Sequence, residues 1–302
     1  MSIPKILKII RIHIVVGGFL AFSLGALLGI AGGGSFNPAL FGLGYLVVLL
    51  GDLSSHYSND YFDVEVDKFI EQKKFFSGST ILVNNPDLRS LSRYISISLL
   101  GCSNFLAAIL FVLGMPIEFL MVFFVASLVG WFYSAPPIRI ISRGLGEFAV
   151  ACVTGFAIPG LGYLTTRGHF DALFVYFAIP FIMYGLMLSL GLQVSDIEVD
   201  CKANKKTLAV RLGENQVFSI ILVMAFSSTL LFWIYAWQDL ISFANFDAVI
   251  IFSIFPLITS LIGSAGVLWK KKVNLFSTLI IASLFVFNLL LILYLMVVWL
   301  LW

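Results

Sequence analysis

The chain alternates between long apolar runs and short polar segments. Stretches without Asp, Glu, Lys or Arg cover residues 14–51, 94–117, 119–138, 148–166, 172–195, 215–238, 248–269 and 273–302. A helix needs roughly 20 apolar residues to cross a bilayer, so the first run could hold most of two crossings. It is interrupted at 32–38 by Gly-Gly-Gly-Ser-Phe-Asn-Pro, which is typical of a turn. The pattern therefore predicts nine transmembrane helices, near residues 12–31, 39–60, 94–114, 117–132, 147–165, 172–195, 216–237, 248–269 and 275–300.

The composition agrees with a membrane protein. Hydrophobic residues make up 60% of the 302 residues, charged residues 11%, and the mean hydropathy is +1.04. A soluble globular chain of this length is far more polar. Outer-membrane strands are excluded because they run only about 10 residues with alternating polarity. We expect an all-α integral membrane protein, a bundle of nine transmembrane helices around a central cavity, with cap loops on the cytoplasmic side.

The basic residues lie on one side of the predicted bundle. Of the 18 Lys and Arg residues, all but Arg167 fall in the N-terminal segment or in the loops after the second, fourth, sixth and eighth spans. Lys and Arg are enriched in cytoplasmic loops. We therefore expect a multi-pass protein of the plasma membrane, with its N-terminus and these loops in the cytoplasm. No nucleic-acid-binding motif is present, so a nucleic acid is not an expected partner.

Two similar acidic segments end the second and sixth spans. Asp63-Val-Glu-Val-Asp67 and Asp196-Ile-Glu-Val-Asp200 differ by one conservative change. Both lie at the cytoplasmic end of a predicted helix. This indicates a duplicated helical unit. We expect a single domain over residues 1–302, with a pseudo-repeat of about 12–140 and 144–270 and a closing helix at 275–300.

The spacing of the acids predicts a metal site. Residues four apart share a helix face, so Asn59, Asp63 and Asp67 form one stripe, and Asp196 and Asp200 form another. Clustered carboxylates without His or Cys suit hard cations, and a cation with few protein ligands usually bridges phosphate oxygens. We interpret both stripes as ligands of two Mg²⁺ ions that bridge a diphosphate. The alternative is a solvated charge run at a helix end, which two near-identical copies disfavour.

Polar residues also continue the first stripe into the membrane. Asp52 and His56 precede Asn59 at helical spacing. A polar helix face at this depth indicates a cavity rather than lipid. We therefore include His56 among the substrate-binding candidates, although a hydrogen bond between helices would also explain it.

Basic residues next to the stripes are candidates for binding a diphosphate and stabilising it as a leaving group. Any one of them could instead only help to set the orientation of the protein in the membrane, or contact anionic lipid. Arg139 and Lys206 are the leading candidates. The complete set is Lys73, Lys74, Arg139, Arg143, Lys202, Lys205 and Lys206.

These motifs resemble the UbiA-type intramembrane prenyltransferases. Residues 59–67 resemble the first family signature, NDxxDxxxD, and residues 196–207 resemble the second, DxxxDxxxGKxT, with Asn204 where the family usually has Gly. The resemblance covers most of the chain and agrees with nine helices. It implies an isoprenyl diphosphate donor whose polyprenyl group is transferred to an aromatic or lipid acceptor within the membrane.

The acceptor is less clearly indicated. Residues 207–213, and Tyr-Ser-Ala-Pro-Pro at 133–137 followed by Gly-Leu-Gly-Glu at 144–147, resemble the naphthoate prenyltransferases of menaquinone synthesis. This favours an aromatic acceptor of the naphthoate or benzoate type and a place in quinone biosynthesis. Tyr-Ser-Ala-Pro-Pro also resembles chlorophyll-type enzymes, so a chlorin-type or glycerol-phosphate lipid acceptor stays open.

The resemblance and the chemistry imply the same mechanism. Mg²⁺ and nearby bases neutralise the diphosphate as the allylic C–O bond breaks. Asp63, Asp196 and Arg139 are the catalytic candidates around the diphosphate. Tyr133 is the candidate for cation–π stabilisation of the allylic cation, although a tyrosine of the interfacial belt would have the same position.

A cation-coupled secondary transporter is the alternative from another class, since helical repeats with carboxylates also describe such proteins. Transporters place their coupling acids near the bilayer midplane. Here both stripes lie at the cytoplasmic ends of helices, and among the acids only Asp52 falls in the interior of a predicted span. This position favours an enzyme.

Overall fold

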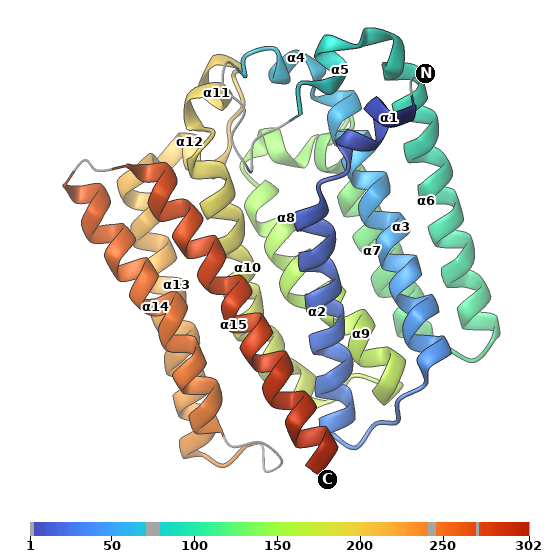
Figure 1. Cartoon of the computed structure of the whole chain (residues 1–302), viewed down its shortest axis with the longest axis vertical. Coiled ribbons are helices and arrows are strands. Elements are labelled where there is room, and N and C mark those ends of the chain that lie inside the picture. Colours follow the sequence, from blue (N-terminus) through green and yellow to red (C-terminus); the bar gives the residue numbers. More distant parts are fainter. Residues whose placement is uncertain (1–2, 71–78, 241–245, 270–271, 302) are drawn as a thin grey trace.

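The computed structural model describes residues 3–70, 79–240, 246–269 and 272–301. These residues form helices and connecting turns, with no strand among them. Nine helices in this part of the chain are long and apolar enough to cross a membrane. They run side by side as one bundle (Figure 1). The prediction of an all-α bundle of nine transmembrane helices is therefore confirmed.

Eight of the crossings are continuous helices. They are α2 (Ile12–Ala31), α3 (Pro38–Phe62), α6 (Arg89–Val112), α7 (Ile117–Ser134), α10 (Ala172–Val194), α13 (Glu214–Trp237), α14 (Phe246–Leu268) and α15 (Val273–Leu301). Short helices cap one end of the bundle, beside the N-terminus (Figure 1): α1 (Ile3–Ile6), α4 (Val64–Asp67), α5 (Ile81–Asn84), α11 (Ile197–Lys202) and α12 (Leu208–Leu212).

The remaining crossing is composite. It consists of α8 (Gly146–Cys152), a π-helical turn (Val153–Ala157) and α9 (Ile158–Arg167). Pro159 cannot donate the backbone hydrogen bond that would reach the carbonyl of Gly155, and a proline in a helix commonly forces such a local change. Single π-turns are common at functional sites. This one widens the helix beside the cavity described below.

Two local sequence signals explain how α2 is joined to α3. Gly33 adopts a left-handed backbone (φ +93°), which glycine allows at little cost. Asn37 then caps α3, because its side chain accepts hydrogen bonds from the backbone N–H groups of Ala39 and Leu40 at 3.0 and 3.2 Å. Pro38 occupies the first helical position, which needs no N–H donor.

The start of α6 differs from the expectation. The helix begins at Arg89 rather than at residue 94, and Pro86–Leu88 form a 3-10 turn that leads directly into it. Asp87 has no side-chain capping role there, contrary to what its position suggests. The first turn of α6 carries charged residues and so lies outside any charge-free run.

Glycines bring α2 against α9. A Cβ atom at Gly25 would lie 1.8 Å from the carbonyl oxygen of Pro159, and one at Gly162 would lie 1.9 Å from that of Phe22. The two backbones therefore touch, as small residues permit between membrane helices. α15 packs against α2, α10 and α14, so the C-terminal helix closes the bundle beside α2.

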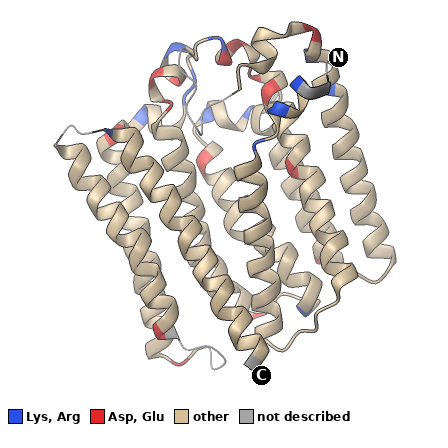
Figure 2. Cartoon of the chain, in the orientation of Figure 1, with Lys and Arg blue, Asp and Glu red and all other residues tan. Residues whose placement is uncertain are grey.

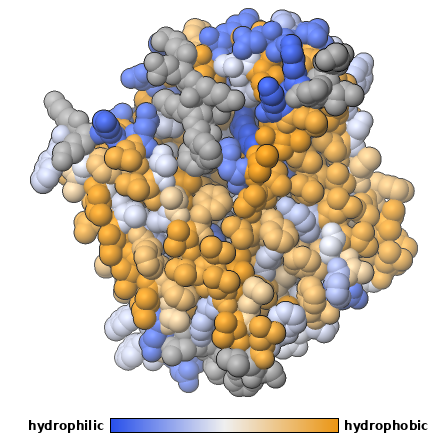
Figure 3. Space-filling view, viewed as in Figure 1, coloured by the Kyte–Doolittle hydropathy of each residue, from blue (hydrophilic) through white to orange (hydrophobic). Residues whose placement is uncertain are grey.

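Charged residues gather at the capped end of the bundle (Figure 2), and apolar side chains cover most of its length (Figure 3). At the opposite end, Arg167 forms an ion pair with Asp171 at 3.1 Å. The Tyr163 hydroxyl donates a hydrogen bond to the same carboxylate at 2.7 Å. Among the described residues, most charged side chains therefore lie at the capped end.

Candidate active site

The two acidic segments have the same local backbone. Each long helix, α3 or α10, is interrupted at the first Asp of the motif, and a short helix follows. Asp63 has φ −96° and ψ 7°, and Asp196 has φ −109° and ψ 8°. The N–H groups of Asp67 and Asp200 donate to the carbonyls of Asp63 and Asp196, at 2.9 Å in both segments. The spacing of four is thus retained across the break.

Asp63 lies where the two segments meet. Lys205, which follows the second segment, has its Nζ atom 3.2 Å from Asp63 Oδ2. Ser134, at the end of α7, donates to the same oxygen at 3.2 Å. The guanidinium of Arg139 lies 3.7 Å from Asp63 Oδ1. This carboxylate therefore links α3, the loop after α7 and the loop after α11.

The other acids of the motifs lie close to Asp63. Asp67 and Asp200 are both buried, and each interacts electrostatically with Asp63 and Lys205. Burial, with smaller contributions from the Asp60 and Asp63 carboxylates, raises the pKa of Asp67 to about 8. Burial also raises the pKa of Asp200 to about 6, against the opposing effect of Lys205. A bound cation would relieve this crowding of carboxylates.

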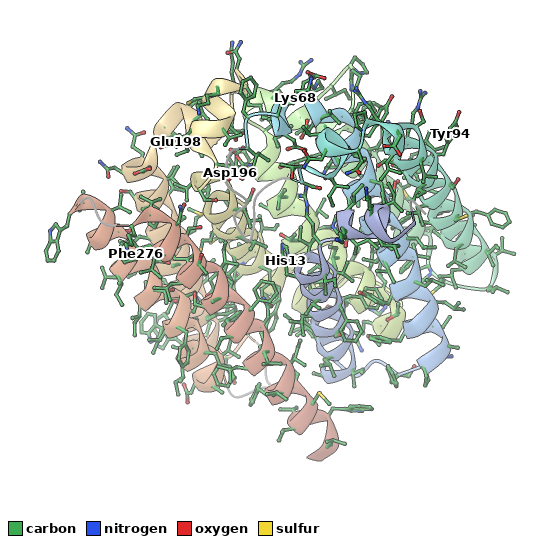
Figure 4. All side chains as sticks on the ribbon, turned by 45° about the horizontal axis from the view of Figure 1, so that its top comes forward. His13, Lys68, Tyr94, Asp196, Glu198 and Phe276 are labelled. Carbon is green, nitrogen blue, oxygen red and sulfur yellow. The ribbon has the colours of Figure 1, made fainter. Side chains whose placement is uncertain are left out.

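Asp196 and Glu198 lie differently at this end of the bundle. In Figure 4, which turns the capped end toward the viewer, Asp196 lies nearer the centre and Glu198 nearer the outer edge. Glu198 is exposed, whereas Asp196 is half-buried. Glu65 in the first segment is likewise exposed and pairs with Lys68 at 2.7 Å. The two Glu residues thus lie on the outer side of their segments.

A cavity of about 330 Å³ lies inside the bundle, and Asn59 of the first acidic stripe is among the residues that line it. Its polar lining residues include Arg11, His13, Asp52, His56, Asn59 and Tyr133. Apolar residues of α2, α10 and α15 line the part deeper in the membrane, among them Leu24, Phe181, Leu284 and Phe285. The predicted central cavity is therefore present, with a polar upper part and an apolar lower part.

Tyr133 lies between the two acidic segments. It lines the cavity and is close enough to Glu147, Asp63 and Asp200 to interact with them electrostatically. Its side chain is half-buried. This position within the bundle is not that of a tyrosine in a lipid-facing belt.

The predicted bases divide into two groups. Arg139 and Lys205 contact Asp63, whereas Lys202 and Lys206 are exposed. Arg143 is also exposed, and its guanidinium donates to the carbonyls of residues 137 and 138 in its own loop. Lys73 and Lys74 lie outside the described residues. Lys205, not Lys206, is thus the lysine of the second motif that reaches the cluster.

Arg11 is a member of the site that the sequence did not single out. Its Nη2 atom lies 2.9 Å from Oδ1 of Asp60, and the Asp60 side chain is fully buried. The pair ties the beginning of α2 to the end of α3 beside the acidic cluster. The sequence contains only a weak signal for Arg11, because basic residues before the first span are also expected from the positive-inside rule.

Glu147 was also missed as a site residue. It is completely buried on α8, and its carboxylate accepts a hydrogen bond from the backbone N–H of Leu208. Thr207, the last residue of the second motif, caps the same short helix by accepting from the N–H of Val210 at 3.2 Å. Glu147 and Thr207 together fix the loop that carries Lys205.

The donor atoms fit a hard cation. Among the described residues, no three His, Cys, Asp or Glu side chains converge closely enough to enclose an ion by themselves. However, Oδ1 of Asn59, Oδ2 of Asp60 and Oδ1 of Asp63 are buried without a hydrogen-bond partner. Buried oxygens are normally satisfied. Oxygen donors that need further partners suit Mg²⁺, which usually also binds substrate phosphates.

Known proteins are similar to this chain in sequence and in fold. Residues 19–277 match the UbiA prenyltransferase family. The chain is 28% identical over 225 residues to digeranylgeranylglyceryl phosphate synthase of Sulfolobus acidocaldarius, covering 73% of this chain and 74% of that protein. It is 26% identical over 234 residues to the enzyme of that name from Saccharolobus solfataricus, covering 73% of each.

Solved structures agree in fold. A UbiA homologue from Archaeoglobus fulgidus bound to GPP and Mg²⁺ superimposes with a TM-score of 0.70 at 18% identity, over 97% of this chain and 99% of that one. The apo structure of a UbiA homologue from Aeropyrum pernix K1 gives a TM-score of 0.70 at 13% identity, over 94% and 98%. The family and these relatives favour the enzyme over the transporter alternative. The chain therefore belongs to the UbiA prenyltransferase family and is a multi-pass membrane prenyltransferase.

Proposed function

We propose that this enzyme transfers a prenyl group from an isoprenyl diphosphate to the hydroxyl of a glycerol-phosphate lipid in a Mg²⁺-dependent reaction. The observation that carries the proposal is the contact between Lys205 and Asp63, which joins the two acidic segments. Tyr133, which interacts electrostatically with Asp63, and Asn59 line the neighbouring cavity. The site therefore brings together three features: carboxylates that can bind metal ions, basic side chains that can bind a diphosphate, and apolar space for the prenyl tail.

The names of the curated relatives favour a lipid acceptor. Their product, digeranylgeranylglyceryl phosphate, contains a glyceryl phosphate rather than an aromatic ring. This agrees with the glycerol-phosphate alternative better than with the naphthoate or benzoate acceptor favoured by the motifs. Quinone biosynthesis has no support from these relatives.

The contacts around the Tyr-Ser-Ala-Pro-Pro motif support a role for it in binding the donor rather than the acceptor. Ser134 lies within this motif and Arg139 shortly after it, and both side chains contact Asp63. The motif therefore shapes the diphosphate end of the site. Enzymes with different acceptors can share it because they use the same kind of donor.

In the proposed site, Asn59, Asp63 and Asp67 would hold one Mg²⁺ ion, and Asp196 and Asp200 would hold a second. When bound, the ions neutralise charge on the departing diphosphate. Lys205 and Arg139 reach the same carboxylate from two loops and would bind diphosphate oxygens. Of the other predicted bases, Lys202, Lys206 and Arg143 are exposed, and Lys73 and Lys74 lie outside the described residues. Charged donors of this kind stabilise a leaving group most strongly where water is excluded.

Tyr133 and the apolar lining protect the carbocation. Tyr133 and Asn59 both line the cavity. When the diphosphate of the donor is bound at the acidic segments, the first carbon of the donor would lie in this part of the cavity. An electron-rich ring face stabilises a cation by about 0.5–2 kcal/mol. The residues around the lower cavity exclude water, which would otherwise capture the cation.

We also propose that the capped end faces the cytoplasm, at the plasma membrane. The near-uniform location of Lys and Arg at this end supports that orientation. The shared backbone of the two acidic segments likewise supports a larger pseudo-repeat of about 12–140 and 144–270.

An acceptor panel tests the proposed function. Purified protein in liposomes would receive radiolabelled geranylgeranyl diphosphate, with Mg²⁺ or EDTA, and either geranylgeranylglyceryl phosphate, a dihydroxynaphthoate or a hydroxybenzoate. We expect Mg²⁺-dependent transfer to the glyceryl phosphate. Transfer only to an aromatic acid would show that the acceptor class is wrong.

A further inference from the structure

An acidic side chain inside the membrane faces the cavity at a distance from the metal cluster. Asp52 lies on α3, and eleven residues separate it from Asp63, or roughly 16 Å along a helix axis. Its side chain is 22% exposed and lines the cavity. A carboxylate within a membrane span is costly and usually has a function. The diphosphate site described above does not use it.

His56 lies one helical turn from Asp52 toward the capped end. The two side chains are 3.5 Å apart, between His56 Nε2 and Asp52 Oδ1. That separation is long for a direct hydrogen bond. Both ring nitrogens of His56 are buried without a hydrogen-bond partner, although the residue lines the cavity. A buried polar group in this condition is destabilising unless a ligand satisfies it.

A hydroxyl group in the cavity could bridge these two side chains. It would accept a hydrogen bond from Nε2–H of His56 and donate one to the carboxylate of Asp52, so that Nε2 and the carboxylate each gain a partner. The order along α3 is also suitable. Asn59 lies at the proposed diphosphate site, His56 one turn deeper and Asp52 another turn deeper. The pair therefore lies on the membrane side of the diphosphate, where the first donor carbon would emerge.

We infer that Asp52 and His56 bind the acceptor hydroxyl and that Asp52 takes its proton during transfer. The inference rests on the proposed function, because an alcohol must lose a proton when it is alkylated. The bond between the first donor carbon and the diphosphate breaks, and its electron pair leaves with the diphosphate. The acceptor oxygen bonds to that carbon, and the hydroxyl proton moves to the Asp52 carboxylate, which releases it before the next turnover.

The strongest neighbouring base, Arg11, is paired with another acid and therefore does not occupy the Asp52 carboxylate. Three titratable neighbours interact electrostatically with Asp52 or His56: Arg11, which precedes α2, His13 in α2, and Tyr45 in α3. Arg11 is held by Asp60 at 2.9 Å rather than by Asp52. Arg11 and His13 line the same end of the cavity, where an acceptor phosphate would be attracted.

Asp52→Asn tests the inference directly. It keeps the side-chain shape but removes the proton acceptor, so we expect kcat for the hydroxyl acceptor to fall about 100-fold or more. Binding of geranylgeranyl diphosphate with Mg²⁺ should remain unchanged, which also shows that the variant is folded. Asp87→Asn, at an exposed acid on the turn before α6, is the matched control and should behave as wild type.

A thiol analogue of the acceptor separates catalysis from structure. A thiol ionises near pH 8.5 and needs little help to become a nucleophile. We expect Asp52→Asn to reduce transfer to the thiol less than tenfold. His56→Gln should mainly raise KM for the hydroxyl acceptor, by about tenfold, because it removes a positioning hydrogen bond.

The outcomes distinguish this inference from the proposed function. Wild-type transfer to the hydroxyl acceptor, together with near wild-type kcat in Asp52→Asn, would overturn the inference alone. Equal losses with hydroxyl and thiol acceptors would also overturn it. A wild-type protein that prenylates only aromatic carbon would overturn both.

Discussion

At the residue scale, a single left-handed residue decides which lysine reaches the acidic cluster. Asn204 has φ +55°, and the chain turns there so that the N–H of Lys205 donates to the carbonyl of Asp200 at 2.9 Å. The Lys205 side chain is consequently buried against Asp63, while Lys206 remains exposed. The family usually has Gly at the position of Asn204, and Asn is among the residues that tolerate this backbone.

The two adjacent lysines form a matched pair for mutation. Lys205→Ala should reduce prenyl transfer about 10- to 100-fold, because it removes a buried cation from the proposed diphosphate site. Lys206→Ala should change transfer less than about twofold, since an exposed lysine contributes little. Initial rates at saturating Mg²⁺ provide the measurement. A larger loss in Lys206→Ala than in Lys205→Ala would contradict the assignment.

The backbone at Asn204 can be tested separately. Asn204→Gly should preserve the melting temperature and transfer, because glycine adopts positive φ freely. Asn204→Ala should destabilise this turn by about 1 kcal/mol and weaken donor binding by moving Lys205. Melting curves and the Kd for geranylgeranyl diphosphate would show both effects. Identical behaviour of the Gly and Ala variants would refute this role for the turn.

At the element scale, the candidate active site is formed where long helices are interrupted, at Asp63 and Asp196 and beside the π-turn. The charge-free runs predict the crossings well, since crossing a bilayer requires an apolar helix. They could not predict the composite crossing, because the π-turn at 153–157 arises from one proline and its packing. The acidic repeat identified the metal-binding candidates. It could not identify Glu147, whose function depends on a loop that lies far away in the sequence.

Glu147 links α8 to the loop of the second motif. Glu147→Ala would leave the backbone N–H of Leu208 unpaired, so we expect a loss of about 1–3 kcal/mol in stability and weaker diphosphate binding. Glu147→Gln retains an acceptor oxygen and should be milder. Thermal unfolding in detergent with and without donor provides the measurement. If Gln and Ala were equally harmful, the charge rather than the hydrogen bond would be responsible.

At the scale of the whole molecule, the charge asymmetry predicts the orientation in the membrane. Composition and loop charges establish a bundle with one polar end, and family motifs indicate its chemistry. The sequence predicts a central cavity, but most of its lining residues and the pairing of Lys205 with Asp63 depend on contacts between distant helices, so no sequence pattern specifies them. The acceptor illustrates the same limit, because the motif that suggests an aromatic acceptor lies next to Asp63, in the proposed diphosphate site.

Two cysteine reporters test the orientation. The native cysteines are free, and Cys201 is exposed at the capped end. With Cys102 and Cys152 replaced by Ser, Cys201 should react with a membrane-impermeant maleimide only from the cytoplasmic side. A second variant with His169→Cys as its single cysteine, exposed at the opposite end, should react only from outside. Labelling of both positions from one side would rule out this topology.

The most direct test of the account compares the two acidic segments in one assay. Wild-type protein, Asp63→Asn and Asp196→Asn would each receive geranylgeranyl diphosphate and geranylgeranylglyceryl phosphate in liposomes, and mass spectrometry would identify the ether product. Glu65→Gln and Glu198→Gln, at exposed acids of the same segments, serve as controls. We predict Mg²⁺-dependent product with the wild type and both controls, and a loss of about 100-fold or more in both Asp variants. Product formation without Mg²⁺, or wild-type rates in either Asp variant, would contradict the account.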